Sequence, residues 1–580
     1  MLTTNYYNDF FEFGQQKINF SFFELSLPDD DPVYTLKKVM EELDFSGLLA
    51  NCSDKGRTGY NPIMMYAVVT YANMRGIRSV DRIVDLCERD LAFIWLTRGQ
   101  KPKRDAFYDF KNRKLTSDVL DDLNYQFMRR LQKEGLVTLK GLFIDGTKIE
   151  ANANRYTFVW RGSINYHLAG LLDSIDQLFE KYNSFLQEND YGTKYELGNA
   201  QMFVIEGMDK VREVIEKNRK RKLVKHKKLS NNRIIEIDNC SPLEIRKLQN
   251  NLTMIADNEG IEFVYGKGKR KPALQQLHEE LEQCGKRLME YKECFEIMGK
   301  DRNSYSKTDL EATFMRMKED HMLNGQLKPA YNVQIAVENY FIVHGYVSSD
   351  RTDYNTLIPV LEKHKNAFGR ILEEVTADSG YCSEKNLLYL KRNEISSYIK
   401  LQDHEKRKTR AYSEDISKYY NMRTGIFEDE QFYICHDGRE LRHLRTESKE
   451  QDGYTQTFEV YGCADCSGCE HKARCLYKYD AEKDAEKNKV MKINEQWEEL
   501  KERSHANIQS ERGILKRQTR SIQTEGHFGD IKENENFRRF NYRSADKVYK
   551  EFMLYAIGRN INKYHRFLYE KLRKFEGKTA

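Results

Sequence analysis

The stretch GLFIDGTKIEANANRYTFVWR, residues 141–161, carries the pattern that decides the fold. From Leu136 to Ala153 apolar and polar residues alternate around a turn that contains glycine, and β-branched residues are frequent, which predicts a strand or a hairpin. Asp145 closes the apolar run that precedes it. A carboxylate at the end of a buried strand is costly unless it is paired, hydrogen-bonded or bound to a metal. Asp145 is therefore the first candidate site residue.

Two further segments predict more strands of the same sheet. AYNVQIAVENYFIVHGYVSS, residues 330–349, indicates two strands joined near Glu338 and Asn339, and ILEEVTADSGY, residues 371–381, indicates a strand that ends in Asp378. Two aspartates at strand ends converge if the strands are neighbours, and oxygen ligands of this kind suit Mg²⁺ or Mn²⁺. Taken singly, each aspartate is more often a turn former that satisfies backbone donors.

Periodicity and composition divide the chain into an α/β core with additions. Three- and four-residue apolar spacings between residues 61 and 136 predict helices, with Ser79 and Ser117 as N-caps and Gly76, Gly99 and Gly135 at helix ends. We assign 1–136 to an N-terminal helical domain, 137–162 and 308–400 to two parts of the core, 163–307 to a charged helical insertion, 401–500 to a cysteine-rich insertion, and 501–580 to basic C-terminal helices of the core.

The helical insertion carries an apolar seam. Its residues follow a spacing of three and four, which keeps them on one side of a helix: Leu274, Leu277, Leu281, Cys284, Leu288, Tyr291, Phe295 and Met298. A second helix offers Leu168, Leu171, Ile175, Leu178, Tyr182 and Phe185. We favour a helical hairpin packed on itself over an intermolecular coiled coil, because only four heptads are present. Two basic runs, at 217–228 and 267–271, are solvated loops or contacts to a nucleic-acid backbone.

Length and composition indicate an intracellular, multidomain protein. A chain of 580 residues exceeds the size of one hydrophobic core, and no segment approaches the apolar length of a membrane helix, so we expect a cytoplasmic protein without a membrane partner. The formal charge of +5 alone does not argue for nucleic-acid binding. Residues 501–580, however, hold 19 Lys and Arg against 10 Asp and Glu, which makes this end a candidate phosphate-contacting surface.

A cysteine cluster lies between Asp378 and the basic end. The sequence CADCSGCEHKARC places Cys463, Cys466, Cys469 and Cys475 close together, with Cys435 upstream. Closely spaced thiols in a cytoplasmic protein favour a metal site, and tetrahedral thiolate suits a structural Zn²⁺. An iron–sulfur cluster and unligated reduced thiols are the alternatives. The spacing does not decide which four cysteines bind.

The chain as a whole resembles the DDE transposases of bacterial insertion sequences. The resemblance rests on four ordered blocks: GLFIDGTKIEANANRYTFVWR (141–161), KPAYNVQIAVE (328–338), TADSGYCSEKNLLYL (376–390) and RSIQTEGHFGDIKENENFRRFNYR (520–543). The most similar group is insertion-sequence family eleven-eighty-two, whose N-terminal domain is similar to residues 57–136. The resemblance implies a ribonuclease-H-like core and an N-terminal domain that binds DNA.

Carried over to this chain, the resemblance implies a triad of Asp145, Asp378 and Glu525 that binds two Mg²⁺ or Mn²⁺ ions. Lys532 matches an accessory lysine, seven residues after Glu525 and hence on the same helical face. Arg520 matches an accessory arginine loosely, with four residues between it and Glu525 where three are usual. Arg517 stands where a tyrosine is usual. His527 is a second auxiliary candidate, although a single helical histidine more often packs or caps.

The resemblance also implies partners and ligand sets. It suggests Cys435, Cys466, Cys469 and Cys475 as Zn²⁺ ligands with Cys463 as an extra, double-stranded DNA as substrate, and a homodimer in the DNA complex. The basic residues expected to contact DNA are Lys220, Arg221, Lys269, Arg270, Arg517, Arg538 and Arg539. The expected activity is cleavage at terminal inverted repeats and transfer of the 3′ ends to a target. The alternative is a catalytically inactive DNA-binding regulator of the same descent. A third class, a coiled-coil interaction protein, would not explain the predicted strands or the cysteines.

Overall fold

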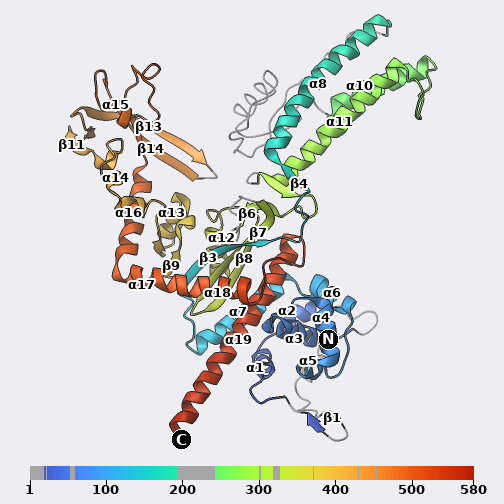
Figure 1. The fold of residues 1–580 in the computed structure, drawn as a ribbon, viewed down its shortest axis with the longest axis vertical. Helices are drawn as coiled ribbons and strands as arrows, with labels where there is room; N and C mark the ends of the chain where they lie inside the picture. The colour runs from blue at the N-terminus through green and yellow to red at the C-terminus, as the bar shows by residue number, and fades with distance from the viewer. Residues whose placement is uncertain are drawn as a thin grey trace.

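The computed structural model describes most of the chain. The described residues are 18–20, 23–25, 27–52, 59–191, 242–299, 302–317, 327–369, 371–428, 430–451 and 454–579. Residues 217–228, with Lys220 and Arg221, lie outside this part of the chain. Figure 1 shows a sheet at the centre, two arms that project from it, and helices of both chain ends packed beside it.

The central sheet contains the three predicted β segments. Its strands are β3 (Gly141–Glu150), β6 (Thr313–Arg316), β7 (Leu327–Glu338), β8 (Phe341–Ser348), β9 (Glu374–Ala377) and β10 (Ser396–Ile399). They follow the order β10-β9-β3-β7-β6, and β8 pairs with β7. β3 is antiparallel to β7 and parallel to β9, and β9 is parallel to β10. The predicted hairpin at Glu338 and Asn339 is confirmed by the antiparallel pairing of β7 with β8.

The position of Asp145 differs from the prediction. β3 runs without a break through Asp145 and Gly146, so Asp145 lies in the middle of a strand and not at its end. Gly146 is not a turn residue, because its pairing with Gln334 of β7 is regular. A Cβ atom at residue 146 would lie 2.4 Å from Gln334 Nε2 and 2.9 Å from Asp353 Oδ1. Gly146 therefore permits a close approach of side chains to the strand.

The N-terminal region is helical, as predicted. Its elements are β1 (Ile18–Phe20), β2 (Phe23–Leu25), α1 (Pro32–Met40), α2 (Ser46–Ala50), α3 (Pro62–Met74), α4 (Val80–Arg89), α5 (Leu91–Thr97), α6 (Arg104–Asp109), the π-helix η2 (Phe110–Lys114) and α7 (Ser117–Lys133). Gly76, Gly99 and Gly135 end helices with φ near +70°. Ser79 precedes α4 as predicted, but the N-cap of α7 is Thr116, whose hydroxyl accepts from the Val119 N–H, and not Ser117.

A long C-terminal helix connects the N-terminal helices to the sheet. This helix, α19 (Ala545–Thr579), contacts α1, α3 and α7 on one side and β8 on the other. One hydrophobic core consequently includes residues of the N-terminal helices, the sheet and α19. Asn560 of α19 is fully buried; its Nδ2 donates to Ile342 O at 2.8 Å and its Oδ1 accepts from Ile342 N at 2.8 Å. These bonds fix α19 against the edge of β8.

Gly558 sets the distance between α19 and α3. A Cβ atom at residue 558 would lie 2.8 Å from the backbone nitrogen of Met74. Backbone atoms cannot move aside without separating the helices, so Gly558→Ala is expected to lower the free energy of unfolding by about 1–3 kcal/mol. Gly170→Ala, in the helical arm and with no atom within 4 Å of the added carbon, is the matched control and should be neutral or slightly stabilising. Chemical denaturation measures both, and equal effects would contradict the close packing.

The predicted helical hairpin is confirmed as one of the two arms. It consists of α8 (Arg161–Glu188), α10 (Pro242–Asn258) and α11 (Ala273–Met298), between the short strands β4 (Phe158–Trp160) and β5 (Ser304–Ser306). β4 and β5 pair antiparallel at the base of the arm, which brings the start of α8 beside the end of α11. The predicted seam residues of α8 and α11 share a separate hydrophobic core with α10.

The second arm contains the cysteine-rich insertion. Its elements are α14 (Arg410–Ser413), β11 (Arg423–Phe427), β12 (Glu430–Ile434), β13 (Glu440–Gln451), β14 (Tyr454–Cys463), α15 (Lys472–Cys475) and β15 (Val490–Ile493). The five strands form one antiparallel sheet in sequence order. Its core is small and includes two of the cysteines: Tyr433, Leu441, Tyr461, Cys463, Cys466, Met491 and Ile493. Because this core is small, the segment needs a further cross-link to be stable.

Helices cover the central sheet. They are α12 (Leu357–Phe368), α13 (Glu384–Arg392), α16 (Glu495–Gln509), α17 (Glu511–Arg520), the π-helix η6 (Ser521–Glu525), α18 (Gly526–Gly529) and the π-helix η7 (Asp530–Asn534). α17 contacts β9 and β10, and η6 contacts β3 and β7, so the segment from Glu511 to Asn534 crosses the strands that carry the aspartates. In the described ranges, none of the helices combines the length and apolarity needed to cross a lipid bilayer.

Candidate active site

Asp145 and Asp378 lie level with each other on neighbouring parallel strands. The register of β3 and β9 places Phe143 opposite Thr376. Two residues further along both strands, the same register brings Asp145 level with Asp378, which follows β9 directly and keeps an extended backbone. Side chains two residues apart on a strand point to the same face, so both carboxylates follow Phe143 and Thr376 to one face. The structure thus brings these two predicted site residues together.

The Arg520 guanidinium is bonded to Asp145 and acts on Asp378 through its charge. Arg520 Nη1 donates to Asp145 Oδ2 at 2.7 Å, and the Thr524 hydroxyl donates to the same oxygen at 3.0 Å. Asp145 is 7 % exposed. Burial raises the pKa of Asp378, and the negative charge of Asp145 raises this pKa further, whereas the Gly380 N–H and Arg520 lower it. Two carboxylates that are partly desolvated and share one cation favour the binding of an additional cation.

π-helical turns change the spacing of the predicted accessory residues. In a π-helix residues five apart lie one turn apart, so η6 places Glu525 one turn after Arg520 despite the additional residue between them. The prediction that Glu525 and Lys532 share a face assumed an unbroken α-helix, and it stays a prediction. The π segments η6 and η7 interrupt that periodicity, Glu525 is exposed, and Lys532 is only 6 % exposed.

Glu525 follows a residue that contacts Asp145, but in the described structure it does not complete a metal site with the two aspartates. Its neighbour Thr524 contacts Asp145, whereas the Glu525 side chain is exposed. Among the residues that the structure describes, no three His, Cys, Asp or Glu side chains are arranged to hold a metal ion. His527 is buried and bonded through Nε2 to the Tyr340 carbonyl, and burial lowers its pKa to about 4. His527 is therefore a neutral packing residue.

Asp353 is a site residue that the sequence did not predict. It follows β8, and its Oδ1 accepts from Asn332 Nδ2 at 2.7 Å and from Gln334 Nε2 at 2.8 Å. Gln334 Oε1 in turn accepts from the hydroxyl of Tyr381, three residues after Asp378. The negative charge of Asp353 also contributes to the raised pKa of Asp378. The network thus links β7 to the turn that carries Asp378.

A signal for this network was present in the sequence. Asn332 and Gln334 are two residues apart in an otherwise apolar strand, so both point to the same face. Both are buried, at 2 % and 0 % exposed. Buried amides require hydrogen-bond partners, and a nearby acidic loop such as SSDRTD (348–353) could have supplied one.

Removal of the Asp353 charge should weaken metal binding at the site without unfolding the protein. Asp353→Asn is expected to reduce metal-dependent activity and Mn²⁺ affinity by about 10- to 100-fold, the usual effect of changing a group that orients metal ligands. Isothermal titration with Mn²⁺ and a cleavage assay measure the two effects. Asp105→Asn, an exposed aspartate on α6, is the control. An Asp353→Asn protein with the Mn²⁺ affinity of wild type would exclude a positioning role.

The cysteine cluster gathers at one end of the second arm. Cys435 follows β12, Cys463 ends β14, and Cys475 ends α15. Burial raises the pKa of Cys475, and the charges of Cys435, Cys466 and Cys469 raise it further, whereas the charge of Lys489 lowers it. Cys466 Sγ accepts from the Lys489 N–H at 3.4 Å, while Cys463 Sγ donates to the Asp465 carbonyl at 3.2 Å.

The basic residues expected to contact DNA have different surroundings. Lys269 and Arg270 are exposed in the loop between α10 and α11, at the end of the arm away from its β4–β5 base. Arg538 pairs with Glu533, and Arg539 lies 3.6 Å from Glu150. Arg517 is half-buried on α17, and its Nε has no hydrogen-bond partner in the described structure. Lys269, Arg270, Arg538 and Arg539 are thus exposed, and Arg517 is half-buried.

Two family models match the chain. Residues 21–113 match a model described as "Transposase domain (DUF772)", and residues 434–565 match a model described as "Transposase DDE domain". The matches support an insertion-sequence transposase. The second model includes Glu525, Lys532 and the cysteine cluster, whereas Asp145 and Asp378 lie between the two matched segments. A search of curated proteins and a search of solved structures each found no match.

The mixed α/β architecture fits a DDE transposase, and this family indicates an enzyme that acts on DNA. DDE domains generally use divalent metal ions. The geometry at Asp145 and Asp378 is compatible with that chemistry, because carboxylate oxygens are the ligands that Mg²⁺ and Mn²⁺ prefer.

Proposed function

We propose that the protein is a DDE transposase that binds the terminal inverted repeats of its element, cleaves the DNA and transfers the 3′ ends to a target. The observation that carries the proposal is the placement of Asp145 level with Asp378 on parallel strands, beneath the helical segment that carries Glu525. The order β8-β7-β3-β9-β10, with β3 antiparallel to β7 and parallel to β9, supports a ribonuclease-H-like core.

Asp145, Asp378 and Glu525 would hold two Mg²⁺ or Mn²⁺ ions. The donor set fits, because Asp145 and Asp378 are partly buried carboxylates, Arg520 is paired with Asp145 alone, and the pKa of Asp378 is raised. When bound, two such ions activate an attacking hydroxyl and stabilise the leaving oxygen of an in-line phosphoryl displacement. Glu525 is exposed and can change rotamer toward the aspartates without disturbing the core. In this proposal Arg520 and Lys532 compensate phosphate charge near the scissile bond.

Cys435, Cys466, Cys469 and Cys475 are proposed to hold one structural Zn²⁺. The backbone N–H donated to Cys466 is compatible with a thiolate, whereas Cys463 donates its own proton to a carbonyl and fits the additional, unligated cysteine. A Zn²⁺ ion would cross-link a sheet whose apolar core is small. Reduced thiols of this kind suit the cytoplasm, where we place the protein.

DNA contacts are proposed for two regions. The N-terminal helical domain would read the terminal repeats, and the basic residues of the C-terminal segment and of the helical arm would bind phosphates. Lys269 and Arg270 are exposed at one end of that arm. Because transposition joins two element ends, we propose a homodimer in the DNA complex. Membership of insertion-sequence family eleven-eighty-two is part of the same proposal.

The test is metal-dependent cleavage of terminal DNA. A labelled duplex from the inverted repeats that flank the gene is incubated with the protein and Mg²⁺, Mn²⁺ or EDTA, and with a target plasmid. Wild type should cleave and join only with metal, and Asp378→Asn and Glu525→Gln should do neither. Specific binding without cleavage by wild type would indicate an inactive DNA-binding regulator, and would refute the proposal.

A further inference from the structure

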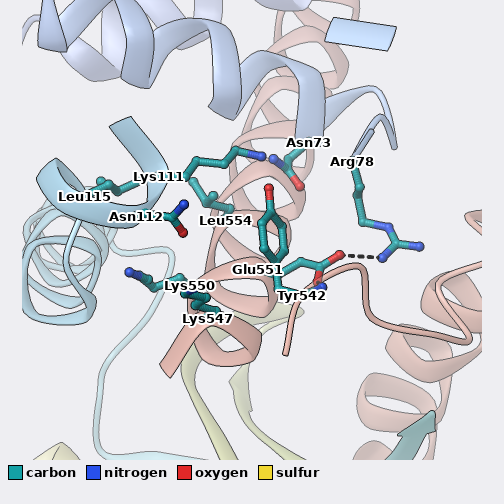
Figure 2. A pocket seen from close by; sticks show the side chains of 10 residues that line it. All are labelled: Asn73, Arg78, Lys111, Asn112, Leu115, Tyr542, Lys547, Lys550, Glu551 and Leu554. Atoms are coloured by element: carbon teal, nitrogen blue, oxygen red, sulfur yellow. Dashed lines mark hydrogen bonds and ion pairs between the residues drawn. The ribbon is translucent and has the colours of Figure 1, made fainter. Parts of the chain in front are cut away.

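A basic pocket lies between the N-terminal helices and the start of α19. It has an empty volume of about 400 Å³ including its open mouth. The lining residues come from α3, η2, the loops around Arg78 and Tyr542, and one side of α19 (Figure 2): Asn73, Arg78, Lys111, Asn112, Leu115, Tyr542, Lys547, Lys550, Glu551 and Leu554. Four of these side chains are cationic and one is anionic.

The one carboxylate of the pocket is already satisfied. Glu551 pairs with Arg78 at 2.8 Å and accepts from the Asn541 N–H at 2.9 Å and from Asn541 Nδ2 at 2.9 Å. Arg78 in turn lies over the ring of Phe537 at 3.7 Å and donates to the Arg539 carbonyl. Arg78 and Glu551 thus compensate each other, and the remaining cations of the pocket keep an excess of positive charge. Lys550 pairs with Asp546 at 3.1 Å, which leaves Lys111 and Lys547.

Lys111 is the unusual member of the pocket. It is only 8 % exposed, and within the described structure its ammonium group makes no hydrogen bond or ion pair; its one contact of this kind is to the ring of Tyr542 at 5.7 Å. Figure 2 shows the side chain extending across the pocket to Asn73. Burial and the charge of Arg78 lower the pKa of Lys111 to about 8, whereas the charge of Glu551, which is already paired with Arg78, raises it. A buried ammonium without a partner is costly, so an anion in the pocket would relieve the cost.

We propose that this pocket binds a phosphate group through Lys111 and Lys547. A tetrahedral oxyanion offers several acceptors to such donors. Both lysines line the pocket, Lys547 with an exposed side chain and Lys111 with a buried one, so a phosphate that enters from the surface would pass from the first to the second. Because the pocket joins η2 and α3 to α19, and α19 packs on β8, a bound phosphate stabilises the junction between the N-terminal helices and the sheet.

The phosphate has two sources, a DNA backbone and a free or small-molecule phosphate. The first source rests on the proposed function, and the second does not. Lys111→Met removes the charge and keeps the length; because it removes an unpaired buried charge, the variant should fold at least as stably as wild type. Lys547→Met is the second variant. Lys133→Met, an exposed lysine on α7, is the matched control.

Two measurements separate the sources. In thermal unfolding at constant ionic strength, inorganic phosphate should raise the Tm of wild type and of Lys133→Met but not that of Lys111→Met, since a ligand that binds only the folded state stabilises it. Fluorescence anisotropy with duplex DNA at several salt concentrations gives the slope of log K against log salt concentration. Loss of one contact to the DNA backbone should reduce the magnitude of this slope by about one.

The outcomes decide between the sources. A reduced salt slope in Lys111→Met and Lys547→Met assigns the pocket to a DNA phosphate, and a lost phosphate-induced Tm shift with an unchanged slope assigns it to a free phosphate. If neither quantity differs from the Lys133→Met control, the pocket is not a phosphate site. The phosphate arm remains decisive even if wild type binds no DNA, so the failure of this proposal is distinct from the failure of the proposed function.

Discussion

Replacement of Asp145 by Asn is expected to lower the rate of metal-dependent DNA cleavage by more than about 100-fold. Mutation of a group that only orients metal ligands already lowers metal affinity or activity by about 10- to 100-fold. Asn has nearly the same shape, and its single Oδ1 can still accept from the Gly146 N–H, while its Nδ2 takes the place of the oxygen that accepts from Thr524; the fold should be retained. It loses the charge that faces Arg520 and would bind metal. Single-turnover cleavage of labelled terminal DNA measures the effect.

Asp105→Asn serves as the control for this substitution, since Asp105 is an exposed aspartate of α6 and lies in a different part of the fold. Thermal unfolding and DNA binding of both variants should match wild type. Cleavage by Asp145→Asn at the wild-type rate would show that the carboxylate pair is not the active site. Equal losses in both variants would point to a general effect on folding.

Cys466→Ser should remove the bound Zn²⁺ and unfold the cysteine-bearing sheet. Structural zinc contributes on the order of 10 kcal/mol in small metal-dependent folds, and the apolar core of this sheet is too small to replace it. We expect about one Zn²⁺ per chain in wild type and none in the variant. Elemental analysis gives the metal content, and hydrogen exchange across residues 423–493 reports the loss of structure.

Cys463→Ser is the matched control, because Cys463 lies on the same sheet and donates to the Asp465 carbonyl. It should retain Zn²⁺ and native hydrogen exchange. Loss of metal in Cys463→Ser with retention in Cys466→Ser would reverse the ligand assignment. If the wild-type protein contains iron and absorbs visible light, the cysteines hold an iron–sulfur cluster and not zinc.

Alternation of apolar and polar residues was sufficient to predict the strands that carry Asp145 and Asp378. It was not sufficient to place Asp145 within its strand, because Gly146 has the appearance of a turn residue. The structure gives the physical reason for this glycine: Gln334 and Asp353 pack against the backbone where a Cβ atom would stand. When segments that are distant in sequence pack this closely, the only indication in the local sequence is the small residue at the point of contact.

The helical segment after Glu511 shows a second limit of sequence periodicity. Heptad spacing between Glu525 and Lys532 predicts a shared face only if every turn is α-helical, and the π turns η6 and η7 break that condition. The same π turn accounts for the additional residue between Arg520 and Glu525. Asp353 was missed because its partners Asn332 and Gln334 are on another strand, and pairing of buried polar groups is not visible in local spacing.

The proposed active site requires that Asp145 and Asp378 bind one divalent metal ion between them. Anomalous diffraction from crystals of the protein with terminal DNA and Mn²⁺ locates such an ion directly. We predict an anomalous peak in contact with both carboxylates, with Glu525 turned toward it, and no peak at this position in Asp145→Asn. An Mn²⁺ ion bound elsewhere on the protein, with Arg520 still paired to Asp145, would contradict the account.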